Sequence, residues 1–204
     1  PDEKRAWFKK IWWKLPLGFR PYLYFGYRMI FKLGILDGKK GIVFGALDSK
    51  SIAWKVAERC VEEGATIVLT NAPVAMRLGE INELATKLNA QVIPADATSI
   101  EDIENLFTQS MEILGGKIDF VLHSIGMSVN VRKGRHYTDQ NYEFTMKGID
   151  VSALSFHKVL QCAMKQDAMN DWGSILAFSY IAAQRVFPDY NDMADNKSYL
   201  ESIA

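Results

Sequence analysis

Two tyrosines and a lysine near the C-terminal end of this chain follow an apolar, strand-like run at residues 174–178. Tyr180, Tyr190 and Lys197 come after that run in this order. A phenol can donate a hydrogen bond to a developing oxyanion, and a nearby ammonium can stabilise that charge and hold a cofactor hydroxyl. On a helix, seven positions amount to about 700° of rotation, which would place Tyr190 and Lys197 within ~20° of one face. The spacing therefore predicts that both side chains meet one ligand.

Each of these residues also has an ordinary structural interpretation. Taken separately, Tyr180 and Tyr190 are more often packing residues of an amphipathic segment, and Lys197 is more often a solvated helix charge. Their joint occurrence in this order, directly after a strand, is what favours chemistry.

Strands and helices alternate from residue 40 onward, and this alternation must position the three residues. The expected helices are 51–63, 74–88 and 100–114, with a long helix within 142–169. The expected strands are 40–44, 66–70, 91–95, 118–123 and 174–178. Such alternation predicts a parallel sheet covered on both faces, and right-handed crossovers then give a doubly wound, Rossmann-type α/β domain. Ligands of such domains bind above the C-terminal ends of the strands.

The first strand-to-helix turn could face a phosphate although it lacks the G-x-G-x-x-G fingerprint. Gly45 permits a tight exit from the strand, Ser51 can cap the helix, and the small Ala53 allows close packing. The helix N-terminus can then face a pyrophosphate. An ordinary capped turn would have the same residues, so this turn alone does not decide between the two interpretations.

Two further strand ends offer cofactor contacts. Asp96 follows the third strand, where its carboxylate or the neighbouring backbone can receive the exocyclic amine of an adenine; in isolation it is more often a turn residue. After the fourth strand, Gly126 allows close backbone approach and Ile125 offers an apolar wall. His123 is more often a satisfied core histidine than a catalyst, and we assign it no role.

Composition narrows the class of protein. With 204 residues, 49% of them hydrophobic and 24% charged, the chain can bury one main core. Residues 1–34 hold eight basic against two acidic residues, a net +6, so the neutral total leaves −6 on the rest. An acidic main domain argues against nucleic-acid binding. Cys60 and Cys162 have no metal-ligand spacing, which favours a reduced, cytoplasmic protein and no metal site.

Residues 1–34 differ from the rest of the chain because aromatic rings alternate there with lysines and arginines. Such mixing suits a membrane interface, and no apolar run reaches the ~18 residues of a spanning helix. An arm that packs on a partner subunit, or a non-native appendage, would fit equally. Residues 14–25 followed by 33–39 resemble the membrane-proximal C-terminal tail of bacterial family-two glycosyltransferases. We therefore predict an aromatic, basic, helical N-terminal extension over residues 1–37, joined to a domain at 38–204, with possible attachment to a membrane through residues 1–34.

The ordered set of motifs from residue 38 to 204 resembles the bacterial NADH-dependent enoyl-acyl-carrier-protein reductases, which are divergent short-chain dehydrogenases of type II fatty-acid synthesis. The resemblance rests on Gly45-x5-Ser51-x-Ala53, Asp96-Ala97, 123–126, Ser179-Tyr180 and Tyr190-x6-Lys197. A generic short-chain dehydrogenase fits less well, because it spaces its tyrosine and lysine as Tyr-x-x-x-Lys and commonly has a serine where this chain has Ala177.

The resemblance implies a role for each candidate residue. Tyr190 would hydrogen-bond the thioester enolate oxygen, and Lys197 would hold the nicotinamide ribose. Tyr180 and Ser128 would lie beside the substrate. The implied reaction delivers hydride to the β-carbon of a trans-2-enoyl thioester. The dinucleotide contacts would come from Gly45, Ser51, Ile52, Ala72, Asp96, Ala97, Ser124, Ile125, Gly126 and Lys197.

The choice of cofactor rests on the end of the second strand, at residues 70–73. No acidic residue is present there to bind the adenosine ribose diol, and Arg77 could approach a 2′-phosphate. The resembled enzymes often lack that acid and still use NADH, so NADH is the favoured cofactor and NADPH stays open.

The sequence stops in the helix expected to contain Lys197, whereas the resembled fold continues with further strands, helices and a substrate-covering loop. The resemblance therefore implies a C-terminally truncated reductase, acting on an acyl-carrier-protein-linked substrate and forming a homotetramer when complete. The alternative is an inactive, truncated or chimeric dinucleotide-binding fragment with a membrane- or partner-binding arm. A reductase for another carbonyl or enoyl substrate is disfavoured by the Tyr-x6-Lys spacing.

Overall fold

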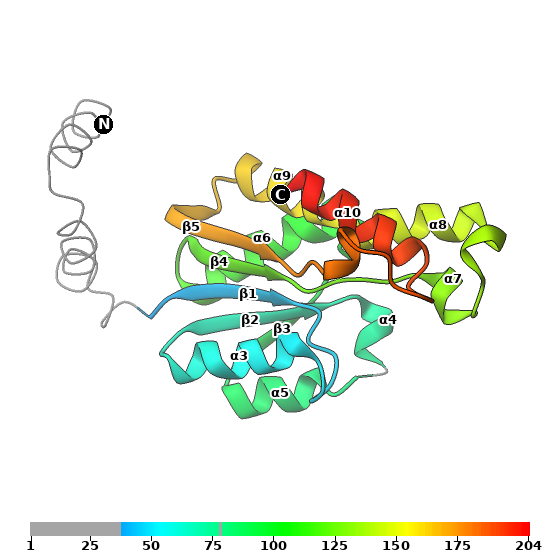
Figure 1. Cartoon of the computed structure of the whole chain (residues 1–204). Helices are drawn as coiled ribbons and strands as arrows, with labels where there is room; N and C mark the ends of the chain where they lie inside the picture. Colours follow the sequence, from blue (N-terminus) through cyan, green and yellow to red (C-terminus); the bar gives the residue numbers. More distant parts are fainter. Residues whose placement is uncertain (1–37, 78) are drawn as a thin grey trace, which may run out of the picture. The chain divides into compact units, whose positions relative to one another are not determined.

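Five parallel strands form one sheet in the order β3-β2-β1-β4-β5. The computed structural model describes residues 38–77 and 79–204, so the expectations for residues 1–37 lie outside the described residues (Figure 1). The strands are β1 (Lys40–Phe44), β2 (Thr66–Asn71), β3 (Gln91–Pro94), β4 (Ile118–His123) and β5 (Met169–Ala177). The order and the parallel pairing confirm the doubly wound, Rossmann-type α/β architecture.

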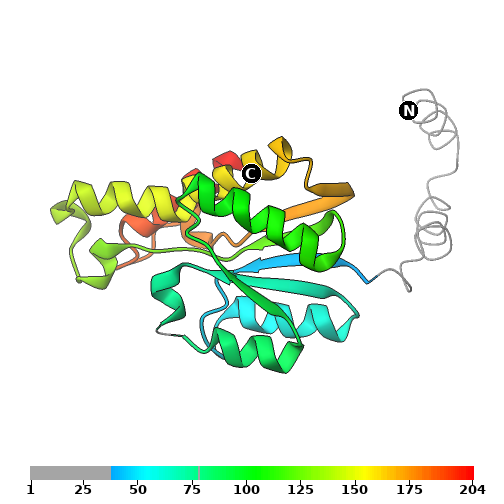
Figure 2. The ribbon, with the colours of Figure 1, turned by 180° about the vertical axis from the view of Figure 1, so that it is seen from behind.

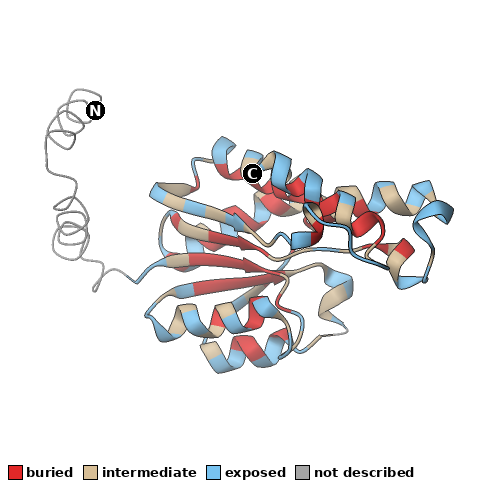
Figure 3. Cartoon of the chain, viewed as in Figure 1, coloured by how far each residue is buried: buried red, intermediate tan, exposed pale blue. Residues whose placement is uncertain are grey.

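Helices cover both faces of the sheet, as Figures 1 and 2 show from opposite sides. One face carries α3 (Ile52–Glu62) and α5 (Ile81–Leu88), and the other carries α6 (Ile100–Leu114) and α9 (Ser155–Lys165). Successive side chains of a strand point to opposite faces, so in β1 Ile42 and Phe44 pack into the core under α6 and α9, while Val43 packs under α3 and α5. Burial is concentrated on β1, β2 and β4, whereas β5 is largely half-buried or exposed (Figure 3).

The helix expected at 74–88 is instead two helices, α4 (Pro73–Met76) and α5. The break has a tertiary cause. The backbone N–H of Glu80 donates to the Leu47 carbonyl at 2.8 Å, and a Cβ on Gly79 would lie 2.6 Å from that same oxygen. The helical spacing of apolar residues does not record this close approach of two backbones, so that spacing alone could not predict the interruption.

The long helix expected within 142–169 is present but interrupted. It consists of α8 (Tyr142–Ile149), a π-helical turn at Asp150–Leu154, labelled η3, and α9. The strand β5 already begins at Met169, five residues earlier than expected. The remaining short elements are α7 (Val129–Arg132), η2 (Tyr137–Asp139) and η4 (Ile181–Ala183), and the described chain ends with α10 (Asp192–Ile203).

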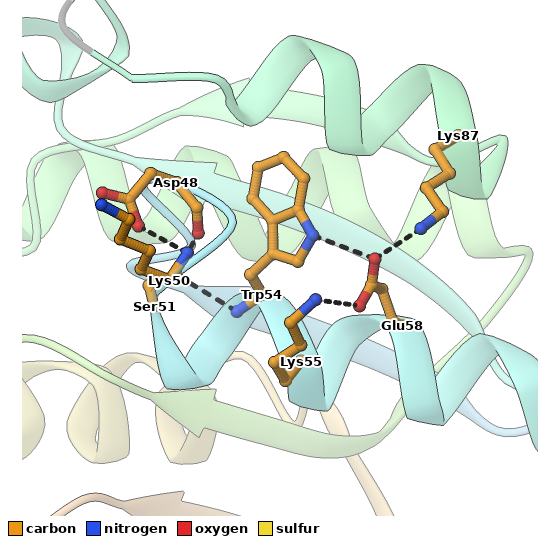
Figure 4. A network of polar contacts seen from close by, with 7 residues as sticks. All are labelled: Asp48, Lys50, Ser51, Trp54, Lys55, Glu58 and Lys87. Atoms are coloured by element: carbon orange, nitrogen blue, oxygen red, sulfur yellow. Dashed lines mark hydrogen bonds and ion pairs between the residues drawn. The ribbon is translucent and has the colours of Figure 1, made fainter.

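A polar cluster joins α3 to α5 within one helical layer (Figure 4). The Glu58 carboxylate accepts hydrogen bonds from Trp54 Nε1 at 3.0 Å, Lys55 Nζ at 2.9 Å and Lys87 Nζ at 2.6 Å. The Lys87 hydrogen bond, foremost, lowers the pKa of Glu58 from 4.5 to about 2. Because Trp54 is buried and Lys87 belongs to α5, this carboxylate connects the core of one helix to the surface of the other.

No helix within residues 38–77 and 79–204 is long and apolar enough to cross a membrane. Over the same described residues, no cluster of three or more His, Cys, Asp and Glu side chains could hold a metal ion.

Candidate active site

A cavity of about 320 Å³ opens at the C-terminal ends of the strands, where doubly wound domains bind ligands. It is formed by residues that lie far apart in the sequence: the start of α3, the loop after β4, the segment after β5 and the start of α10. Its lining is Ile52, Ser124, Ile125, Gly126, Phe178, Ser179, Tyr180, Tyr190, Met193 and Lys197. The fold thus brings all three expected catalytic side chains to one cavity.

Tyr190 and Lys197 meet in this cavity, but not for the expected reason. The sequence predicted both on one helical face, whereas α10 begins at Asp192 and Tyr190 lies before it. Asn191 is the N-cap and has a φ of 48°, so the chain turns sharply between the tyrosine and the helix. The helical-rotation argument is therefore wrong for Tyr190, and a loop rather than a helix turn places its side chain in the cavity that Lys197 also lines.

Lys197 is held by the backbone at the end of β5. Its side chain is buried, and Nζ donates to the Phe178 carbonyl oxygen at 2.5 Å. Burial lowers the pKa of this lysine below its ordinary 10.5. The hydrogen bond offsets part of the cost of burying the charge, and it fixes the ammonium at the floor of the cavity.

Three aromatic rings pack against one another at tilted angles, and the two tyrosines among them line the cavity. The Tyr180 ring centroid lies 4.9 Å from that of Tyr190 and 5.3 Å from that of Phe187. Burial, foremost, and then the neighbouring Tyr180 raise the pKa of Tyr190 above its ordinary 10. The Tyr190 hydroxyl therefore stays protonated at neutral pH, which is the state that donates a hydrogen bond.

The loop after β4 forms the opposite wall and depends on two glycines. Gly45, at the end of β1, has a φ of 85°, and a Cβ there would lie 2.0 Å from the Ser124 carbonyl oxygen. A Cβ on Gly126 would lie 2.7 Å from the Met193 side chain and 3.7 Å from Lys197 Nζ. Gly45 therefore needs glycine for its backbone conformation and for the close approach of Ser124, as expected for a tight exit from the strand, whereas at Gly126 only the flexible end of Met193 would have to move. The approach of a cofactor to Gly126 stays a prediction.

The N-terminus of α3 faces this region. The Ser51 hydroxyl accepts a hydrogen bond from the Trp54 N–H at 3.3 Å, and the next residue, Ile52, lines the cavity with its side chain 66% exposed. The predicted cap is confirmed. An 11-residue helix aimed at the strand ends suits an anionic group such as a pyrophosphate.

Six candidate residues do not line the cavity: Gly45, Ser51, Ala72, Asp96, Ala97 and Ser128. The first five follow β1, β2 and β3, so they lie along the same edge of the sheet as the cavity. One oxygen of Asp96 accepts hydrogen bonds from the Thr98 N–H and hydroxyl at 2.9 and 2.8 Å, which is the turn role that the sequence also allowed. Their proposed cofactor contacts stay predictions.

Ser128 is buried, and its hydroxyl donates to Asp192 Oδ1 at 2.5 Å instead of reaching the cavity. It also caps α7 by accepting from the Val131 N–H at 3.0 Å. Its expected place beside the substrate stays a prediction. Because the hydroxyl already bonds Asp192, such a contact would have to come from the rest of the Ser128 residue.

The cavity also contains residues that sequence reasoning did not single out. Phe178 contributes the carbonyl that holds Lys197, and Met193 packs against Gly126. Met193 follows Tyr190 by three residues, but only the turn at Asn191 directs both toward the cavity, so no local pattern signals it. His123, to which we assigned no role, is a fully buried core residue whose Nε2 lies 2.8 Å from Ser155 Oγ.

The fold and this cavity define a Rossmann-type domain whose cavity at the strand ends is lined by a tyrosine and a lysine. The protein-family model described as "Enoyl-(Acyl carrier protein) reductase" matches residues 45–204. The chain belongs to this family.

Relatives with curated names and solved structures agree. The chain is 35% identical over 170 residues to enoyl-acyl-carrier-protein reductase (NADH) 1 of Rhizobium meliloti, covering 83% of this chain and 61% of the relative. It is 64% identical to FabI of Alistipes finegoldii, with a TM-score of 0.80 over 84% of this chain and 66% of that one. The FabI–NADH complex from the same organism gives a TM-score of 0.81 and covers 84% of this chain and 60% of that one. The chain thus spans about three fifths of the length of the relative from Rhizobium meliloti.

Proposed function

We propose that this chain is part of an enoyl-acyl-carrier-protein reductase that reduces trans-2-enoyl thioesters with NADH. The observation that supports it best is the meeting of Tyr180, Tyr190 and Lys197 in one cavity at the strand ends of a family member. The NADH preference follows relatives whose names or structures specify NADH. Because Arg77 could approach a 2′-phosphate, NADPH stays open as the alternative cofactor.

The residues present fit a dinucleotide. The α3 N-terminus suits a pyrophosphate, the side chain of Ile125 and the backbone at Gly126 line the cavity, and Lys197 contributes an ammonium to the same lining. When bound, NADH supplies a hydride to the β-carbon of the enoyl thioester. We assign the dinucleotide contacts to the residues named for it above, with Lys197 holding the nicotinamide ribose.

The chemistry of the chain's own residues concerns the thioester oxygen. Negative charge develops on that oxygen during conjugate addition, and the protonated Tyr190 hydroxyl donates a hydrogen bond to it. The buried Lys197 ammonium adds electrostatic stabilisation. Tyr180 lines the acyl side, together with Ser128 by our assignment.

The protein's other features stay proposals of the same kind. We propose a cytoplasmic enzyme that forms a homo-oligomer when complete, with residues 1–37 as a separate extension and residues 1–34 as its membrane or partner contact. Liposome binding that is lost when residues 1–34 are removed would support the membrane contact.

The test is NADH oxidation by the purified chain with crotonyl-acyl-carrier protein, followed by the loss of nicotinamide absorbance. Tyr190→Phe should lower turnover by about 10²–10³, the usual loss for one oxyanion donor. Tyr142→Phe, on the exposed surface of α8, is the matched control.

Three results would each contradict a different part of the proposed function. Turnover on an acetoacetyl thioester but not on crotonyl would contradict the proposed substrate. NADH binding without any turnover would favour the alternative of an inactive dinucleotide-binding fragment. Turnover unaffected by Tyr190→Phe would remove the proposed role of this tyrosine.

A further inference from the structure

Asp192 is a carboxylate that the proposed chemistry does not use, although it lies two residues after Tyr190. Its side chain has no exposed surface. Oδ1 accepts from the Ser128 hydroxyl at 2.5 Å, and Oδ2 accepts from Asn130 Nδ2 at 2.9 Å. None of the ion pairs among the described residues includes it. Within the described part of the chain, the hydrogen bonds from Ser128 and Asn130 and the N-terminus of α10 therefore stabilise this buried carboxylate.

The residues that hold Asp192 do not line the cavity themselves, but they follow one of its walls closely in the sequence. Ser124, Ile125 and Gly126 line that wall, and Ser128 comes two residues after Gly126. Asp192 itself is flanked by Tyr190 and Met193, which line the cavity from the other side. The carboxylate therefore connects the two walls at a point just outside the cavity.

A second connection lies one residue earlier. Asn191, which is 8% exposed, donates from Nδ2 to the Arg135 carbonyl at 2.6 Å and accepts at Oδ1 from Gln140 Nε2 at 2.5 Å. The same Oδ1 accepts the Asp192 N–H at 2.8 Å, which holds the backbone at its φ of 48°. A φ of 48° with a ψ of −141° is a conformation that residues other than glycine rarely adopt, so these hydrogen bonds hold the backbone there. Asn191 is thus anchored to the segment between α7 and α8, while Asp192 is anchored to α7 itself and its N-cap.

Asn130 makes the anchor rigid. It is completely buried, its Oδ1 accepts the Asn141 N–H at 3.0 Å, and its Nδ2 lies 3.0 Å from the Thr145 hydroxyl. The amide orientation is fixed by these partners, so Nδ2 must point toward Asp192. An asparagine at position 192 has only one side-chain oxygen. It would therefore place its NH₂ group against one of the two donors, Ser128 or Asn130.

We propose that Asp192 is a positioning residue that sets the Tyr190 hydroxyl against the 124–126 wall by bonding to Ser128 and Asn130. The proposal rests on the function proposed above, and it assigns to Asp192 an effect on the reacting oxygen and not on the adenosine end of the cofactor. Displacements near 1 Å at a reacting centre can lower turnover about 10²-fold. The expected signature is therefore a loss of kcat with little change in NADH affinity.

The experiment compares Asp192→Asn with Asp195→Asn in the full chain. Asp195 is a carboxylate on the same helix, so its substitution removes the same functional group. It is exposed, and its side chain accepts a hydrogen bond from the Tyr137 hydroxyl at 3.2 Å. Asp192→Asn should lower kcat at least about tenfold, with the Kd for NADH within about twofold. In a Tyr190→Phe background the same change should alter kcat less than about twofold, because the effect acts through that hydroxyl. An equal loss in both backgrounds, or no loss at all, would overturn the proposal.

A second readout does not need turnover. In protein carrying ¹³C-labelled tyrosine, the hydroxyl-bearing ring carbon of Tyr190 is assigned by its disappearance in Tyr190→Phe. Asp192→Asn should move this signal and Asp195→Asn should not; an unmoved signal overturns the positioning role even in an inactive chain. Should Asp192→Asn fail to fold, Ser128→Ala removes one donor only and should still move the Tyr190 signal. Absence of wild-type turnover would count against the proposed function alone.

Discussion

The Lys197 ammonium donates to the Phe178 carbonyl oxygen at 2.5 Å, which links α10 to the residue that follows β5. This bond holds the charge at the floor of the cavity that Tyr190 and Tyr180 line. It also means that the lysine is placed by the backbone of the sheet edge and not by an acidic partner. The ammonium therefore keeps capacity for further hydrogen bonds to a ligand.

Replacing this lysine is expected to separate function from stability. Burial lowers the pKa of Lys197, so its favourable contribution to folding is present above pH 10.5 and is lost as the pH falls through the folded-state pKa. At pH 7 the buried charge costs stability. Lys197→Met should therefore weaken NADH binding about tenfold or more, the value of one charged hydrogen bond, without lowering the Tm. Fluorescence titration and thermal unfolding check this, with the exposed Lys165→Met as control; a strongly lowered Tm would contradict it.

Gly45 should be intolerant of the smallest side chain. An alanine Cβ there would lie 2.0 Å from the Ser124 carbonyl oxygen, so the 124–126 wall would have to shift. Gly45→Ala is expected to lower NADH affinity at least about tenfold, with a destabilisation typical of strain at a positive φ. Gly64→Ala is the matched control, because Gly64 has a φ of 90° and nothing within 4 Å of the added carbon. Equal loss of NADH affinity in the two variants would show that backbone strain, not the contact with Ser124, is responsible.

His123 should make the fold sensitive to acid. Burial, foremost, and then the positive charge of Lys197 lower its pKa from 6.5 to about 3. The contribution of a neutral buried histidine is fully present above pH 6.5 and is lost as the pH falls toward 3, because only the unfolded chain takes up the proton. The free energy of unfolding should therefore fall by up to about 1.4 kcal/mol per pH unit in this window from this group. The free energy of unfolding is measured by urea unfolding at several pH values. It should change less steeply with pH for His123→Gln than for the exposed His157→Gln, and an identical pH dependence in the two variants would refute the assignment.

Glu58 should stabilise the α3–α5 pair mainly above its ordinary pKa. Its pKa is lowered to about 2, so its contribution is present above pH 4.5 and is lost as the pH falls toward 2. Glu58→Gln should lower the Tm at pH 7, and the difference from the wild type should narrow as the pH falls below 4.5. Glu62→Gln removes an exposed carboxylate that pairs with Arg59 on the same helix, and it should change the Tm less. Equal effects of the two variants would show that the contact with α5 contributes nothing.

The amino-acid sequence by itself determined the architecture and the identity of the cavity's key residues. Strand and helix periods depend on local residue order, so β1, β4 and α6 are found at the expected bounds, and Ser51 caps α3 as its type predicts. Tyr180, Tyr190 and Lys197 could be singled out because they follow one strand at family-typical spacing. Seven of the candidate site residues line the cavity.

Tertiary structure alone decided how those residues meet. The break between α4 and α5 depends on the hydrogen bond from the Glu80 N–H to the Leu47 carbonyl. The sharp turn at Asn191 depends on hydrogen-bond partners more than fifty positions away. The engagement of Ser128 with Asp192 joins residues that are 64 positions apart. Such contacts arise when separate strands end at one edge of a sheet, and no local period or spacing records them. The sequence therefore named the catalytic candidates, while long-range hydrogen bonds fixed where their functional groups lie.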